Sequence, residues 1–140
     1  NAGQTCISTE EVFVENEIFD EFLESLSAKI KSIKSGSTQN DQLGPIITPE
    51  NKQKINDHLN EIKNKSKVIY GMSGDHDNFI APAIVVEPPE NSKIVNEETF
   101  GPVISVRSFK NEDDLINKIH RLDMVFHQVF LVIIKKEFIE

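Results

Sequence analysis

Two short segments of this 140-residue chain carry residue types that could take part in chemistry. The first is Gly3-Gln-Thr-Cys6, where glycine lets the backbone approach a ligand closely and the chain's single thiol could act as a nucleophile. A lone cysteine is more often a small buried hydrophobe, and no His or Lys lies nearby in sequence to favour the thiolate. Both roles for Cys6 therefore remain open from this segment alone.

The second segment is Glu97-Glu-Thr-Phe-Gly-Pro-Val103, which places two acids beside an aromatic ring and a Gly-Pro turn. A carboxylate accepts hydrogen bonds from paired hydroxyls, and an aromatic ring packs against a flat ligand group. The same residues also suit an ordinary connection between a helix and a strand. Taken alone, the segment does not decide between a ligand site and a connection.

The histidines and the acidic pairs do not form a recognisable metal site. Neither an H-x-x-x-H spacing nor a Cys/His pair at ligand spacing occurs among the four histidines, His58, His76, His120 and His127. We expect Asp75-His76-Asp77 to be a solvated loop tip and His58 to lie at the edge of an apolar helix stripe. The acidic pairs Glu10-Glu11 and Asp113-Asp114 are predicted to face solvent. The sequence predicts no bound metal.

Three amphipathic helices are predicted from the spacing of apolar residues. Apolar side chains recur every three or four positions from Ile18 to Ile33, which is one face of a helix. Thr48-Pro49-Glu50 supplies an N-cap, a proline at the first helical position and an acid in the first turn of a second helix. The stripe of that helix consists of Ile55, Leu59 and Ile62. Asn111 caps a third helix, which extends to Leu122.

Strands are predicted between and around these helices. They cover Glu11 to Val14, Val68 to Tyr70, Phe79 to Val86, Val103 to Phe109 and Val125 to Ile134. Pro82 within the third strand suggests a sheet edge or a bulge. The order strand, helix, helix, strand, strand, strand, helix, strand implies an α/β fold with partly parallel pairing. The last two strands, joined by the third helix, should lie parallel in one sheet.

Composition and charge exclude several classes of partner. The net charge of −8 opposes nucleic acid or an anionic membrane surface as a partner. The longest apolar run, Val129 to Ile134, is far too short to span a bilayer. A single cysteine fits a reducing compartment, and the first residues lack the features of a secretory signal. We therefore expect an intracellular protein, cytoplasmic or mitochondrial.

Several pieces of the chain, in order, resemble the aldehyde dehydrogenase superfamily. Asn1-Ala-Gly-Gln-Thr-Cys6 resembles its nucleophile motif, and Glu97-Glu-Thr-Phe-Gly-Pro102 resembles its second signature. Between them, Gly44-Pro-Ile-Ile47 and Phe79-Ile-Ala-Pro82 match the family's Gly-Pro loop and its aromatic-x-Ala-Pro strand. The resemblance covers about residues 1 to 118. Beyond it, the chain departs from the family pattern, because Asp123-Met-Val125 stands where many members carry Tyr-Gly-Leu.

The resemblance implies a fold and a reaction. The fold would be a three-layer α/β structure, with a mostly parallel sheet and flanking helices, and residues 1–140 would be part of the catalytic domain. The Cys6 thiolate would attack an aldehyde, which NAD or NADP oxidises to a carboxylic acid. Glu98 would hold the hydroxyls of the nicotinamide ribose, Phe100 would pack beside that ribose, and Lys54 would lie near the adenosine ribose.

The resemblance also implies parts that lie outside this chain. The coenzyme-binding domain, the glutamate that activates water and the asparagine that completes the oxyanion hole all precede the nucleophile in the family. No strand–Gly-x-Gly-x-x-Gly–helix unit and no P-loop occur here. We expect the fragment to be inactive alone and the complete enzyme to be a homodimer or homotetramer. Two alternatives remain: a non-catalytic relic acting as a structural subunit, and a semialdehyde dehydrogenase that acylates coenzyme A.

Overall fold

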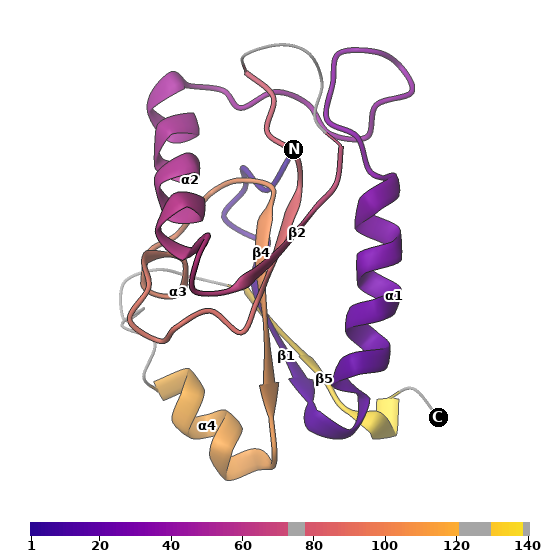
Figure 1. Ribbon diagram of the computed structural model, residues 1–140, viewed down its shortest axis with the longest axis vertical. Coiled ribbons are helices and arrows are strands. Elements are labelled where there is room, and N and C mark those ends of the chain that lie inside the picture. The colour runs from indigo at the N-terminus through magenta and orange to yellow at the C-terminus, as the bar shows by residue number, and fades with distance from the viewer. Residues whose placement is uncertain (73–77, 121–129, 139–140) are drawn as a thin grey trace.

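The computed structural model describes residues 1–72, 78–120 and 130–138 and arranges them in three layers (Figure 1). The middle layer is a five-stranded sheet in the order β2-β3-β4-β1-β5. Its strands are β1 (Thr9–Glu15), β2 (Lys67–Tyr70), β3 (Ala83–Val86), β4 (Val103–Phe109) and β5 (Phe130–Ile134). β3, β4, β1 and β5 run parallel, and β2 pairs antiparallel with β3. The predicted α/β fold with a mostly parallel sheet is confirmed.

Helix α1 (Phe19–Ser32) covers one face of the sheet alone, after a short 3-10 turn at Asn16–Ile18 (Figure 1). Its apolar stripe packs on strand side chains that share one face, among them Val12, Val14 and Val106. On β1, Val12 and Val14 are two positions apart, because successive side chains of a strand point to opposite faces. The predicted helix from Ile18 to Ile33 is confirmed apart from its terminal residues.

The opposite face of the sheet is covered by α2 (Pro49–Ile62), α3 (Lys93–Asn96) and α4 (Glu112–His120). Their apolar side chains pack around Phe13 and Phe109, both nearly fully buried. The predicted helix starts are confirmed. The Thr48 hydroxyl accepts a hydrogen bond from Asn51 N at 3.2 Å, and Asn111 Oδ1 accepts one from Asp114 N at 2.9 Å.

β4 and β5 lie on either side of β1, and each is parallel to it. The prediction that these two strands run parallel in one sheet, with a helix between them in sequence, is therefore confirmed. β5 begins at Phe130, and the predicted start of this strand at Val125 lies outside the described residues. So does the predicted loop tip at residues 75–77. A further 3-10 turn, Lys136–Phe138, follows β5.

Pro82 corrects one detail of the sequence prediction. β3 begins at Ala83, after the proline, and lies between β2 and β4 rather than at an edge or a bulge. Proline has no backbone N–H to donate. It is accommodated directly before β3 because the neighbouring segment forms a hydrogen bond only with its carbonyl. That carbonyl accepts a hydrogen bond from Gly71 N at 2.8 Å.

Candidate active site

The two segments singled out in the sequence meet at the amino-terminal ends of β1 and β4. Gly3 has φ +74°, a left-handed backbone conformation, and a Cβ at this position would overlap the carbonyl oxygen of Gly101. A Cβ on Gly101 would in turn lie 2.5 Å from Ile55 Cδ1 of α2. Glycine is therefore required at position 3 by its backbone conformation and its approach to a backbone carbonyl, and Gly101 leaves room for the Ile55 side chain. They bring the Cys6 segment and the segment that contains Glu98 and Phe100 into contact.

Cys6 lies in an exposed turn that is anchored by its neighbours. Gln4 Nε2 donates to the Pro45 carbonyl at 3.1 Å, and Gln4 Oε1 accepts from Ile47 N at 2.9 Å. The Thr5 and Ser8 hydroxyls hydrogen-bond across the turn at 2.6 Å. Within the described parts of the chain, no group accepts a hydrogen bond from the Cys6 backbone N–H. The turn thus presents both the thiol and this N–H.

The loop at residues 98–101 is held from two sides. Glu10 accepts two hydrogen bonds from it, one from Thr99 N at 3.0 Å and one from Phe100 N at 2.8 Å. From the other side, Asn51 Nδ2 donates to the Phe100 carbonyl at 2.8 Å. Phe100 itself has φ +53°, which is unfavourable for a residue with a side chain. The loop is therefore fixed in a conformation that it would not favour alone.

His58 is fully buried, not at the edge of the α2 stripe as predicted. Its Nδ1 lies 3.1 Å from the Thr99 hydroxyl, and its Nε2 lies 3.4 Å from Glu97 Oε2. Burial lowers the pKa of His58, and the negative charge of Glu97 opposes that shift. The position of His58 between Ile55 and Ile62 on the helix could have indicated this burial, because residues three and four apart share a face.

The three predicted coenzyme residues are half-buried, and each contacts Glu10 or acts on its pKa, but they do not line one common groove. Burial raises the pKa of Glu10, and the hydrogen bonds from the backbone of Phe100 and Thr99 oppose this rise. The negative charge of Glu98 raises the pKa further, whereas the positive charge of Lys54 lowers it. Lys54 also lines a groove of about 590 Å³ together with His58. The lining of that groove contains none of Cys6, Glu98 or Phe100. The charges of Lys54 and Glu98 thus both act on Glu10, whereas the thiol lies on an exposed turn.

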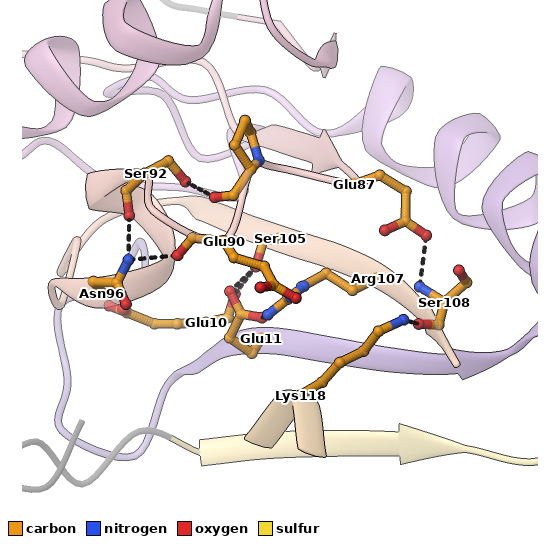
Figure 2. Close-up of polar contacts among 11 residues, drawn as sticks. Glu10, Glu11, Glu87, Glu90, Ser92, Asn96, Ser105, Arg107, Ser108 and Lys118 are labelled. Atoms are coloured by element: carbon orange, nitrogen blue, oxygen red, sulfur yellow. Dashed lines mark hydrogen bonds and ion pairs between the residues drawn. The ribbon is translucent and has the colours of Figure 1, made fainter. Parts of the chain in front are cut away.

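A buried polar cluster lies on β1 and β4 beside Glu10, as Figure 2 shows. Ser105 Oγ donates to Glu11 Oε1, and the Arg107 guanidinium lies 3.9 Å from Glu11 Oε2 and 3.6 Å from Glu90 Oε1. Glu11 is 1% exposed, and its burial raises its pKa to about 7, against the opposing effects of Ser105 and Arg107.

The predicted solvent exposure of Glu10-Glu11 is therefore wrong. Glu10 is half-buried and Glu11 is buried, whereas Asp113 is exposed as predicted and Asp114 is half-buried. The strand period places Glu11 on the same face as Phe13, and this pattern could have revealed its burial. The sequence interpretation also passed over Asn51, whose side chain holds the 98–101 loop.

Residues 1–72, 78–120 and 130–138 hold no group of three or more His, Cys, Asp or Glu side chains placed to bind a metal ion. No helix in this part of the chain is long and apolar enough to cross a membrane.

Comparison with characterised sequences identifies relatives over most of the chain. Glutarate-semialdehyde dehydrogenase of Pseudomonas putida is 32% identical over 119 residues, which are 83% of this chain and 25% of that protein. Succinate-semialdehyde dehydrogenase [NADP(+)] of Escherichia coli is 31% identical over 121 residues, again 83% of this chain and 25% of that protein. The chain spans about a quarter of the length of these relatives.

Solved structures resemble the fold over a similar extent. Betaine aldehyde dehydrogenase of Staphylococcus aureus, in complex with NAD+, superposes with a TM-score of 0.75 at 26% identity, over 95% of this chain and 33% of that one. An aldehyde dehydrogenase of Bacillus cereus gives a TM-score of 0.75 at 22% identity, over 84% of this chain and 25% of that one; at this identity the likeness shows the fold alone. The sequence model of the aldehyde dehydrogenase family matches residues 1–124. The chain belongs to the aldehyde dehydrogenase family.

Proposed function

We propose that this chain is the cysteine-bearing part of the catalytic domain of an NAD(P)-dependent dehydrogenase that oxidises an aldehyde to a carboxylic acid. The observation that carries the proposal is the contact between its two signatures, in which Gly3 of the cysteine segment lies against Gly101 of the Phe-Gly-Pro segment. A segment that presents a thiol and a segment suited to a coenzyme ribose must adjoin if one site is to use both.

Cys6 is the proposed nucleophile. Its thiolate attacks the aldehyde carbon, a carbon–sulfur bond forms and the carbonyl electron pair moves to the oxygen. The backbone N–H of Cys6 can donate a hydrogen bond to that oxygen, which stabilises the charge that develops there. When bound, NAD or NADP supplies the acceptor for the hydride that leaves this carbon. Water then cleaves the Cys6 thioester, which releases the acid and restores the thiol.

Glu98, Phe100 and Lys54 are the proposed coenzyme contacts, and their chemistry fits that role. Ribose hydroxyls are donors, and the half-buried Glu98 carboxylate is an acceptor to which no residue in the described ranges donates a hydrogen bond. Phe100 offers a half-buried ring for packing beside the nicotinamide ribose. Lys54, on α2, is proposed for the adenosine ribose.

The remaining parts of the proposal concern the complete protein. The 140-residue segment would be a partial catalytic domain, and the coenzyme-binding domain would come from the rest of the enzyme chain. This segment matches only 25% of the length of each of the two relatives, which supports that division. We further propose an intracellular enzyme, cytoplasmic or mitochondrial, that assembles as a homodimer or homotetramer.

The test uses the full-length protein that contains this segment. Cys6 should react with iodoacetamide faster than a free thiol at neutral pH, and NAD or NADP should change that rate, because a nucleophile must have thiolate character. Cys6→Ser should abolish this labelling and lower aldehyde oxidation by at least ~10³-fold, with unchanged thermal stability. Equal labelling of native and unfolded protein would instead identify a structural cysteine.

A second arm tests the coenzyme contacts independently of the thiol. Glu98→Gln should weaken coenzyme binding and slow single-turnover NAD(P)H formation, because a neutral amide accepts hydrogen bonds from ribose less strongly than a carboxylate. The control is Asp113→Asn, an equivalent change at an exposed acid on α4. If Glu98→Gln behaves like this control, the second signature is a structural connection only.

A further inference from the structure

The backbone at Phe100 adopts a conformation that needs external support. Its φ of +53° lies in the left-handed region, which costs a residue with a Cβ roughly 1–2 kcal/mol. Asparagine and aspartate tolerate this region better than aromatic residues do. Some other part of the fold must therefore hold the 98–101 loop in this shape.

Glu10 provides that support through two adjacent backbone donors. Thr99 N and Phe100 N both point at its carboxylate, at 3.0 Å to Oε2 and 2.8 Å to Oε1. Successive N–H groups that converge in this way form a small anion-binding concavity, and hydrogen bonds to an ionised acceptor are about twice as strong as neutral ones. Glu10 fills this concavity with a charge that is fixed to the start of β1.

The position of Glu10 in the chain connects the two halves of the proposed site. It lies four residues after Cys6, at the end of the turn that carries the thiol. The same segment touches the loop again where Gly3 meets Gly101. The backbone of Phe100 is thus fixed on both sides, because Glu10 binds its N–H and Asn51 on α2 binds its carbonyl.

We propose that Glu10 is a positioning residue that holds Glu98 and Phe100 in the geometry that receives the coenzyme and keeps this loop in register with Cys6. This inference rests on the proposed coenzyme role of the 98–101 loop. It adds a residue that contacts neither substrate nor coenzyme and acts through two backbone N–H groups.

Glu10→Gln is the decisive variant, because it keeps the size of the side chain and removes one acceptor. An amide has a single acceptor oxygen, and its NH2 group would face a backbone donor. In the full-length protein, the dissociation constants of NAD and NADP, measured by calorimetry, should rise at least ~10-fold. Hydrogen exchange of the Thr99 and Phe100 amides should accelerate in the same variant, which is a readout independent of activity.

A matched control lies at the other end of β4. Glu87 also has a positive φ, 48°, and its carboxylate accepts a hydrogen bond from Ser108 N at 2.7 Å. Glu87→Gln should accelerate exchange of the Ser108 amide and leave coenzyme affinity within twofold of the parent. Coenzyme affinity lowered equally by both substitutions would indicate a general loss of stability and overturn the inference.

A double-substitution cycle separates positioning from stability. Glycine adopts a left-handed backbone without penalty, so Phe100→Gly removes the need for support. In the Phe100→Gly background, Glu10→Gln should still raise the coenzyme dissociation constant. The factor of this rise should be at least ~3 times smaller than the factor in the parent protein. Strictly multiplicative effects of the two substitutions would contradict a positioning role.

The outcomes also distinguish this inference from the function it rests on. If Glu98→Gln weakens coenzyme binding and Glu10→Gln does not, the proposed function stands and the role of Glu10 is rejected. If Glu98→Gln leaves the affinity unchanged, the coenzyme role of the loop fails and the inference fails with it. Weaker binding in both variants, with normal binding in Glu87→Gln, supports the inference.

Discussion

The amino-terminal and carboxyl-terminal ends of the β1–β4 strand pair are built in different ways. At the amino-terminal end, Glu10 binds two backbone N–H groups and Gly3 lies against Gly101. At the carboxyl-terminal end, a carboxylate binds a single backbone N–H, as Glu87 does with Ser108 N at 2.7 Å, and exposed ion pairs such as Lys136 Nζ to Glu17 Oε2 at 3.1 Å lie beside it.

The difference shows where the fold specifies geometry. A backbone N–H has a fixed direction, so a carboxylate that binds two successive N–H groups restricts the position of a loop more than a single hydrogen bond does. An ion pair between two long exposed side chains tolerates many arrangements and contributes little to stability. The proposed site lies at the end where one carboxylate binds two successive backbone N–H groups, as expected for chemistry that depends on exact placement.

The largest expected effect comes from adding a methyl group where the two signatures meet. Gly3→Ala introduces a Cβ that overlaps the Gly101 carbonyl, and it also forces a left-handed backbone on alanine. We expect the free energy of unfolding to fall by at least ~3 kcal/mol, because both backbone strain and a steric clash oppose the native contact. Urea denaturation of Gly3→Ala and of the parent protein measures this loss.

Gly44→Ala is the control for that substitution. A Cβ at Gly44 meets no atom within 4 Å, and the residue belongs to the loop that Gln4 anchors. Its effect on unfolding should stay within ~0.5 kcal/mol. A similar loss in both variants would show that the contact between Gly3 and Gly101 does not organise this end of the sheet.

The next effect concerns the interior of the same strand pair, where Glu11 is buried beside Arg107. Burial raises the pKa of Glu11 from 4.5 to about 7, so the folded state binds its proton more tightly than the unfolded state does. The contribution of Glu11 to the free energy of unfolding therefore declines as the pH rises from about 4.5 to about 7. A rise of this size corresponds to roughly 3 kcal/mol.

Glu11→Gln tests that linkage, because glutamine cannot ionise. The stability of the variant relative to the parent should be greater at pH 8 than at pH 5, by roughly 2.5 kcal/mol. Chemical unfolding of both proteins at the two pH values gives this difference directly. A constant difference across that range would show that Glu11 titrates normally and is not desolvated.

The same residues show how far the sequence could lead. The helices, their N-caps at Thr48 and Asn111 and the parallel sheet followed from local patterns, because periodicity and capping depend on neighbouring residues. The support of the 98–101 loop by Glu10 and Asn51 did not. These contacts join residues that are far apart in the chain, and their geometry depends on strand register, which composition does not reveal.

The smallest effect is expected at the carboxyl-terminal end. Lys136 Nζ and Glu17 Oε2 are 3.1 Å apart, but their side chains are 52% and 67% exposed, so water and salt screen their attraction. A double-mutant cycle of Lys136→Ala and Glu17→Ala should give a coupling energy on the order of 0.3 kcal/mol. That coupling should vanish in 1 M salt, where the screening length is only about 3 Å. A salt-resistant coupling above ~1 kcal/mol would mean that this end of the strand pair is also held in a fixed geometry, and the contrast between the two ends would be lost.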